Sequence, residues 1–277
     1  MRTRRKLVLA GVAIAACAAV ALPNRRDARA EGASLGPPCS SGFLRVPSGT
    51  FTMGSPAGEG DPDEHPAHTL TLPGFCMQRT EVTVADYQSC VASGACTAAG
   101  TGTECNAGVA GRGRHPINCV DWNQATAYCA HIGARLPTEP EWEYAARGPD
   151  ARKYPWGNHA PNGHFLNACD TECVSYALRV HHEVKHAMFP GSDGYETTAP
   201  VGSYPFGASP YGLLDMAGNV YEWTSSPYCP YPSHSCTSPY RMYRGGAWYT
   251  EKTASVATRN GNLPTDRTVV VGFRCAK

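Results

Sequence analysis

The chain has 277 residues, and its 24 Lys and Arg nearly balance its 23 Asp and Glu. Removing residues 1–30 takes away seven basic residues and one acidic residue, so the rest of the chain has a net charge of about −5. This charge argues against a nucleic acid or an anionic membrane as partner, and the length suits one large domain or two small ones.

The N-terminus reads as an export signal, with a basic start, an apolar run over residues 7–23 and a small-x-small cleavage site at residues 28–30. Residues 3–7 also resemble a twin-arginine signal. We expect cleavage after Ala30 and a periplasmic or secreted protein. In an alternative, residues 14–17 form a lipoprotein cleavage box, and a lipidated Cys17 anchors the protein to a membrane. A transmembrane anchor is less favoured because the apolar run is short and rich in alanine.

Twelve cysteines remain after this cleavage, an even number that predicts a disulfide framework in an exported chain. Metal binding is the alternative use of these cysteines, but the sequence contains no CxxC pair. The 29 Gly and 23 Pro indicate that much of the backbone lies in loops and turns. Candidate pairs are Cys90 with Cys96 and Cys105 with Cys119, while a pair of Cys169 with Cys173 stays open.

Local patterns predict short strands at residues 43–46, 49–55 and 69–72. A first helix is expected over residues 81–94, with Thr83 as its N-cap and Gly94 as its stop. Residues 94–118 have no hydrophobic period and should form a surface excursion. A second helix should begin at the cap Asp121 and end at Gly133.

A short helix over residues 138–148 is the most strongly specified element. Thr138 is a natural N-cap, and Glu141 is placed to complete a capping box. Pro140 fits the first turn, where a missing N–H costs nothing, and Gly148 provides the stop. Because Trp142 and the following alanines form an apolar stripe, we expect a buried helix on which loops pack.

Regular structure is hard to predict beyond residue 158. In residues 200–223 the spacing of Gly, Pro and Asn predicts loops. The same residues include large apolar side chains, which need to be buried. Such a loop needs its polar backbone groups satisfied from inside, and bound calcium is one way to do this. Residues 241–248 and 269–276 are two expected strands at the C-terminal end.

Ten motifs carry a resemblance to a known family. They are FTMGS, DEHPAH, EVTVADY, VDWNQATAYC, RLPTEPEWEYAARG, YPWG, TAPVGSYP, YGLLDMAGNVYEWT, RGGAW and GFRCA. Their order resembles that of the formylglycine-generating enzyme (sulfatase-modifying factor) family, over residues 46–275. The resemblance implies one α+β domain over residues 31–277 with the C-type-lectin-like fold of this family. Such a domain is loop-rich, has little regular secondary structure, and is stabilised by disulfides and calcium.

The resemblance also implies two calcium sites and one disulfide. The first site would use Asn167, the carbonyl of Ala168, Asp193 and the carbonyl of Tyr195. The second would use Asp215, the carbonyls of Ala217, Gly218 and Val220, and Glu222. The side-chain ligands are all oxygen donors, as a hard cation needs. The alternative is that these carboxylates cap turns and bond the loop. The implied disulfide joins Cys129 to Cys275.

The family's chemistry is the aerobic oxidation of a cysteine in a sulfatase motif to formylglycine, with copper(I) held by two thiolates. In this chain those two positions fall on Thr250 and Ser255, and the serine of the preceding Gly-Gly-Ser turn is replaced by Ala247. Copper(I) is soft, and hydroxyls are poor substitutes for thiolates. The sequence therefore predicts no family catalytic residue and no copper cofactor.

Two functions follow from this loss. The first is a calcium-stabilised binding module, expected to be a monomer, for an unknown peptide, protein or glycan. Four tyrosines near the lost copper site could contact such a ligand if they are exposed, but they could equally be packed under loops. They are Tyr228, Tyr231, Tyr240 and Tyr243. The second is an oxidase of altered mechanism in periplasmic protein or metabolite maturation.

A third hypothesis is a zinc hydrolase, because residues 182–186 spell HEVKH. On a helix, His182 and His186 would share one face for zinc, and Glu183 would lie beside a bound water as the base. The motif is short and no third ligand is evident, so we consider zinc the least favoured cofactor.

Overall fold

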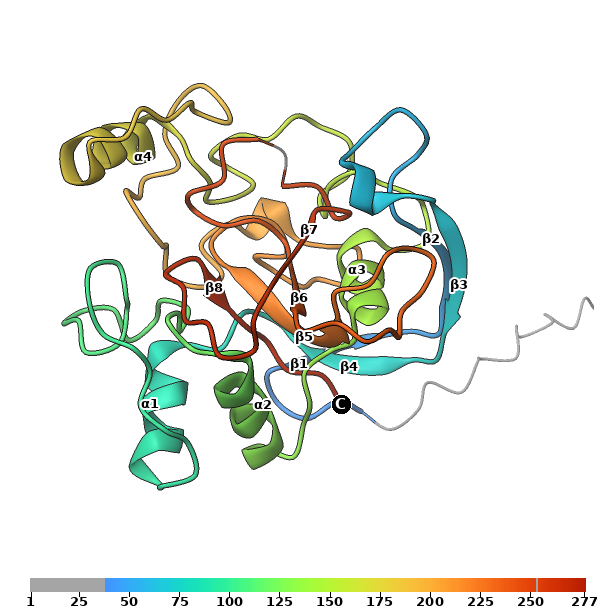
Figure 1. Ribbon diagram of the computed structural model, residues 1–277, viewed down its shortest axis with the longest axis horizontal. Coiled ribbons are helices and arrows are strands. Elements are labelled where there is room, and N and C mark those ends of the chain that lie inside the picture. The colour runs from blue at the N-terminus through green and yellow to red at the C-terminus, as the bar shows by residue number, and fades with distance from the viewer. Residues whose placement is uncertain (1–37, 253) are drawn as a thin grey trace, which may run out of the picture. The chain divides into compact units, whose positions relative to one another are not determined.

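The computed structural model describes residues 38–252 and 254–277, and most of that backbone lies in loops and turns between short helices and strands (Figure 1). The expected export signal at residues 1–30, with Cys17, lies outside the described residues. Within the described part of the chain, no helix is long and apolar enough to cross a membrane.

The strands form three small sheets. β1 (Phe43–Val46) pairs antiparallel with β4 (Phe75–Gln78), and β2 (Gly49–Met53) pairs antiparallel with β3 (His68–Leu72). The third sheet has the strand order β7-β6-β5-β8, with only β5 and β8 running parallel. Its strands are β5 (Tyr221–Pro227), β6 (Arg241–Arg244), β7 (Arg259–Asn262) and β8 (Val271–Gly272).

Three helices begin where the local signals predicted. They are α1 (Val84–Ala92), α2 (Trp122–His131) and α3 (Glu139–Arg147). The shorter α4 (Thr171–Tyr176) was not predicted. Thr83 caps α1, and Asp121 and Thr138 complete capping boxes at α2 and α3. A capping side chain satisfies backbone N–H groups that the first turn leaves unpaired, so these three starts follow from local chemistry.

Helix α3 is buried along its whole length and lies against β2, β5 and β6 (Figure 1). Trp142 is fully buried, and its Nε1 donates a hydrogen bond to Glu222 Oε2 over 2.8 Å. Gly148 ends the helix with φ +71°, and a Cβ at this position would lie only 2.7 Å from Cγ of Pro210. The expectation of a buried helix at the centre of the molecule is confirmed.

The described residues form three hydrophobic clusters, and the two larger ones lie around this centre. In the first, the rings of Tyr87 of α1 and Tyr128 of α2 stack with centroids 5.7 Å apart, and Phe273 packs edge-on against both. In the second, Trp142 of α3 packs with Met53 of β2 and other apolar residues of the N-terminal strands.

The cysteines in the described residues form six disulfides, which confirms the disulfide framework. The pairs are Cys39–Cys76, Cys90–Cys96, Cys105–Cys119, Cys129–Cys275, Cys169–Cys173 and Cys229–Cys236. The Cys129–Cys275 bond connects α2 to the C-terminal segment across 146 residues of sequence. It therefore closes a much longer loop than any of the others.

Three strand expectations needed correction. The strand expected over residues 241–248 ends at Arg244, because Gly245 and Gly246 turn the chain with positive φ values. β5 falls partly within residues 200–223, which were interpreted as irregular, because its pairing with β6 and β8 involves partners distant in sequence. The strand expected over residues 269–276 shrinks to β8. After Gly272 the backbone leaves β5, and the carbonyl oxygens of Phe273 and Cys275 accept hydrogen bonds from Val82 and Gln78 instead.

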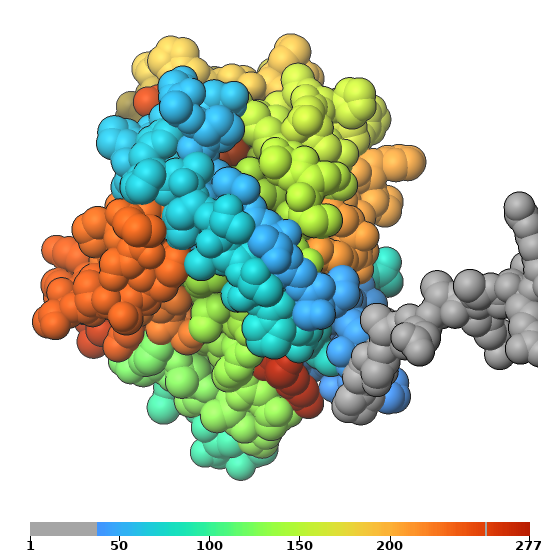
Figure 2. Space-filling model, turned by 90° about the vertical axis from the view of Figure 1, so that its right-hand side faces the viewer, coloured from blue at the N-terminus to red at the C-terminus, as the bar shows by residue number. Residues whose placement is uncertain are grey.

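Figure 2 shows the β2–β3 hairpin, in blue and cyan, running across one face of the molecule beside the orange segment around residues 225–240. The two segments meet at a histidine pair, in which Nε2 of His68 and Nε2 of His234 lie 2.8 Å apart. His234 belongs to the short loop that the Cys229–Cys236 disulfide closes.

Candidate functional site

Thr250 lies in the turn that follows β6. Gly245 and Gly246 begin this turn with φ values of +105° and +80°, and the backbone N–H of Ala247 donates to Thr250 Oγ1 over 2.9 Å. Thr250 lines an open cleft of about 460 Å³. The side chains around it include Asp61, Tyr221, Tyr249, Glu251, Lys252 and Arg259. This cleft carries both signs of charge and two phenol rings, so it suits a polar ligand.

Ser255 is buried, and its Oγ lies 3.1 Å from Thr258 Oγ1. It lines a different and smaller cavity of about 290 Å³, together with Arg147 and Lys153. The two hydroxyls at the thiolate positions therefore line separate cavities, and each hydroxyl already has a nearby hydrogen-bond partner.

All cysteines among the described residues are used in disulfides. Each cysteine there is half of a disulfide, so none is a thiolate that could bind a soft metal. Within residues 38–252 and 254–277, the two positions that hold the family's thiolates therefore offer only the hydroxyls of Thr250 and Ser255.

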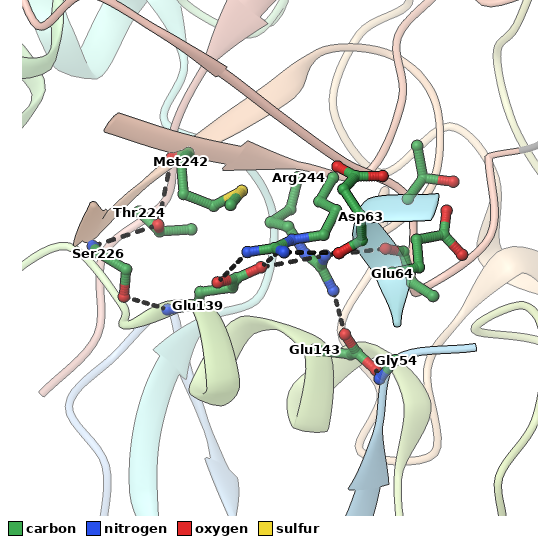
Figure 3. Close-up of polar contacts among 12 residues, drawn as sticks. Gly54, Asp63, Glu64, Glu139, Glu143, Thr224, Ser226, Met242 and Arg244 are labelled. Carbon is green, nitrogen blue, oxygen red and sulfur yellow. Dashed lines mark hydrogen bonds and ion pairs between the residues drawn. The ribbon is translucent and has the colours of Figure 1, made fainter. Parts of the chain in front are cut away.

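Beneath the cleft lies a network of buried ion pairs (Figure 3). Arg259 of β7 lines the cleft and donates two hydrogen bonds to Glu139 of α3, over 2.9 and 3.0 Å. Arg244 of β6 bonds both Glu139 and Glu143, and Glu143 also accepts from Gly54 N and Arg147. Through these contacts α3 fixes the floor of the cleft.

Glu139, at the centre of this network, is almost completely removed from water. Burial raises the pKa of Glu139 above its ordinary value, and the guanidinium groups of Arg244 and Arg259 act to lower it. A buried charge that loses its partner is strongly destabilising, so removing one member of this network should lower the stability of the fold.

The HEVKH segment lies against the cleft residue Tyr249 and does not form a zinc-binding helix. A π-helical turn, Ala177–His181, ends before the motif, and His182 has a left-handed backbone with φ +58°. Glu183 Oε2 accepts a hydrogen bond from the Tyr249 hydroxyl over 2.7 Å. The His186 side chain is 85% exposed with its Nδ1 3.4 Å from Glu251 Oε2, and its backbone N–H donates to the same oxygen over 3.0 Å. The helical geometry that the zinc hypothesis needs is absent, and that hypothesis is corrected accordingly.

The residues expected at the first calcium site come together. Both carboxylate oxygens of Asp193 accept backbone N–H groups, from Ala168 and Tyr195, over 3.0 Å each. Asn167 is buried, and its Oδ1 has no hydrogen-bond partner among the described residues. Because an unpaired buried carbonyl oxygen is costly and calcium takes such oxygens as ligands, these residues fit the ion.

The residues expected at the second calcium site fit the ion only in part. Asp215 is buried in a left-handed conformation, and one of its oxygens accepts from Gly202 N over 2.6 Å. Glu222 is already satisfied, because Arg274 donates two hydrogen bonds to it over 2.7 Å and Trp142 donates a third. No three His, Cys, Asp or Glu side chains group as metal ligands in the described structure, so calcium here would depend on the carbonyls of Ala217, Gly218 and Val220.

Glu81 is a residue of this region that sequence reasoning missed. It is buried between Asp215, Glu222 and Arg274, and its Oε2 has no hydrogen-bond partner among the described residues. Burial raises its pKa well above the ordinary value, and Asp215 adds to the effect. Glu81 belongs to the EVTVADY motif. The residues next to it in sequence do not indicate that its carboxylate shares the Arg274 guanidinium with those of Asp215 and Glu222. A bound cation would offset that excess charge.

The four tyrosines considered as a binding surface differ in exposure. Tyr231 and Tyr243 are buried, and Tyr228 is half-buried with its hydroxyl bonded to Asp63. Tyr240 alone of the four is largely exposed, at 45%. Of the two alternatives left open by the sequence, packing holds for three of the four rings, which lie against Arg259, Trp223 and their neighbours.

These features together define a loop-rich α+β protein with capped short helices, structural disulfides and a C-terminal cleft. A family profile described as "Sulfatase-modifying factor enzyme 1-like domain" matches residues 37–277. The chain belongs to the formylglycine-generating enzyme family.

Three individual similarities support this membership. The formylglycine-generating enzyme of Streptomyces coelicolor is 34% identical, over 93% of this chain and 96% of the relative. A Bos taurus protein named inactive C-alpha-formylglycine-generating enzyme 2 is 38% identical, over 58% of this chain and 50% of the relative. The structure of PvdO from Pseudomonas aeruginosa has a TM-score of 0.68 and 29% identity, covering 84% of this chain and 93% of that one.

Proposed function

We propose that this chain is an exported member of the family that does not carry out copper-dependent formylglycine formation. It acts instead as a calcium-stabilised module that binds a polypeptide segment in the Thr250 cleft. The observation that carries this proposal is the chemistry at the two thiolate positions. Hydroxyls occupy both, they line separate cavities, and every described cysteine is in a disulfide.

The cleft supports a polypeptide as ligand. Its wall presents Asp61, Lys252 and Arg259 together with the amide of Asn260 and the ring of Tyr249. These groups can pair with both signs of charge and with backbone amides, and an aromatic ring adds contact area at low entropic cost. The relative named as an inactive enzyme is consistent with a family scaffold that is used without the oxidation.

The metal content is tested on the natively purified protein by elemental mass spectrometry, before and after EDTA and gel filtration. We expect calcium, no stoichiometric copper, and a lower melting temperature after EDTA that calcium restores. Calcium at 100 times its Kd would add about 2.7 kcal/mol to the free energy of unfolding. Bound copper, or conversion of a sulfatase-type cysteine peptide in air, would overturn the proposal and favour an oxidase of altered mechanism.

The ligand is tested with a random 12-residue peptide library and mass spectrometry of the retained peptides. Lys252→Glu, in the cleft, should shift the retained sequences toward basic residues, because it reverses one charge on the wall. Lys153→Glu, in the Ser255 cavity, is the matched control and should leave the selection unchanged. Equal selections by both variants would contradict binding in the cleft, and retention on a glycan array alone would replace the ligand class.

A further inference from the structure

A third cavity has Tyr176 in its wall and shares no residue with the Thr250 cleft. It has a volume of about 560 Å³, and its wall includes Arg112, His115, Tyr176, Glu104 and Glu196. The ring of Tyr176 packs edge-on against Trp248, next to the cleft residue Tyr249, so the two cavities are neighbours. The wall also includes Tyr195 and Thr198, but the proposed function assigns no ligand to the space between them and Arg112.

The guanidinium of Arg112, which lines this cavity, forms hydrogen bonds only with neutral side chains. Arg112 Nη1 donates to Asn106 Oδ1 over 2.5 Å and to Thr198 Oγ1 over 3.3 Å, and Nη2 donates to Thr197 Oγ1 over 2.9 Å. No carboxylate of the described residues lies within ion-pair distance of it. The half-buried guanidinium is desolvated, and this lowers the pKa of Arg112.

The carboxylates on the same wall already have partners of their own. Glu104 accepts from the Tyr176 hydroxyl over 2.8 Å and contacts His181 Nε2 over 2.5 Å. Glu196 forms an ion pair with Arg179. His115 lies beside Arg112, and burial lowers its pKa to about 4, so it is neutral near pH 7 and supplies no competing charge. The positive charge that remains uncompensated in the cavity is that of Arg112.

The donors of Arg112 that stay free match a planar anion. Its three hydrogen bonds leave Nε–H and one Nη2–H without a partner among the described residues. Nε and Nη2 lie on one edge of the guanidinium, which can hold both oxygens of a carboxylate. The Asn106, Thr197 and Thr198 side chains fix the orientation of the fork before a ligand arrives, and this lowers the entropic cost of binding.

We propose that this cavity is a binding site for a singly charged carboxylate, held by the free edge of Arg112. A carboxylate is favoured over a phosphate because a single guanidinium faces it, and the nearby Glu104 and Glu196 would repel a dianion more strongly than a monoanion. The same chemistry is offered by a free carboxylic acid and by the C-terminus of a peptide. The site is independent of the Thr250 cleft.

The test is isothermal titration of the full mature protein with benzoate and, as an isosteric neutral probe, benzamide. Benzoate should bind at least tenfold more tightly than benzamide. Arg112→Gln should remove this preference, and Arg112→Lys should weaken it because an ammonium lacks the bidentate edge. Arg152→Gln, which removes a guanidinium that pairs with Asp150 and does not line this cavity, is the control and should keep the preference. Equal affinities for the two probes in the wild type would overturn the proposal, even if the Arg112 variants do not fold.

The source of the carboxylate is distinguished with a tripeptide that has either a free or an amidated C-terminus. If the free form binds more tightly than benzoate and the amidated form does not bind, the ligand is a peptide terminus. If benzoate binds more tightly than both, the ligand is a small carboxylic acid. A preference for inorganic phosphate over benzoate would overturn the choice of ligand.

Discussion

Glu139 is the residue on which the charge balance beneath the cleft depends. It is 1% exposed and accepts hydrogen bonds from both Arg244 and Arg259. In Glu139→Gln two buried guanidinium groups would face a neutral amide. Because an uncompensated buried charge is strongly destabilising, we expect a loss of about 3–5 kcal/mol in the free energy of unfolding, measured by denaturant titration.

Glu141→Gln is the matched control for this prediction. Glu141 belongs to the same helix, but its partner Arg135 is 48% exposed, and glutamine can also complete the capping box. We expect a loss below about 1 kcal/mol, as is typical of solvent-exposed pairs. Equal losses in the two variants would mean that the buried network contributes nothing beyond an ordinary surface pair.

His234 should make stability depend on pH. Burial first, and then His68 and Arg259, lower its pKa to about 4, whereas an unfolded histidine has its ordinary value near 6.5. Between these values the unfolded chain binds a proton that the folded chain does not, so acidification from pH 6.5 to pH 4 removes stability. Glu143 acts in the opposite direction, and Arg244 adds to the lowering.

The measurement is the melting temperature at pH 7.5 and pH 5.0 for the wild type and for His234→Asn. The variant should lose less stability than the wild type on acidification, because it has no proton to bind there. Comparison at each pH cancels the opposing effect of buried carboxylates whose pKa is raised, such as Glu64. Identical pH profiles would contradict the role of His234.

At the scale of the element, α3 depends on its first turn. Thr138 accepts from the backbone N–H of Glu141, and Glu141 bonds back to the N–H of Thr138. Thr138→Ala should lower the free energy of unfolding by about 1 kcal/mol because one capping acceptor is lost. Thermal unfolding checks the value, and Thr138→Ser should retain most of the stability. A larger loss in the serine variant would show that the methyl group, not the cap, matters.

At the scale of the whole molecule, the long disulfide should contribute most to stability. Cys129–Cys275 spans 146 residues and Cys169–Cys173 spans four. Loop-closure entropy predicts that replacing both cysteines with alanine costs about 5 kcal/mol for the first pair and about 2 kcal/mol for the second. Denaturant unfolding of the two double variants tests this order, and a reversed order would show that local contacts outweigh the chain entropy.

Part of the fold was predictable because the decisive interactions are local. Thr83, Asp121 and Thr138 each bond backbone groups within three residues, so the helix starts can be read from short stretches of sequence. The missing thiolates at Thr250 and Ser255 were equally plain, because ligand chemistry depends on residue type. The exposure of the tyrosines and the conformation of HEVKH could not be read in this way, since both depend on what packs against them.

What the sequence determined by itself was the family, the capped helices and the replacement of the copper ligands, all of which rest on residue identity at short spacing. Only the tertiary structure decided that Glu139 supports Arg259 under the cleft, that Glu81 joins Asp215, and that Arg112 lacks a carboxylate partner among the described residues. Glu139 and Arg259, for example, lie 120 positions apart in the chain. The energies of such contacts arise from burial and from the balance of charges, and both exist only once the chain has folded.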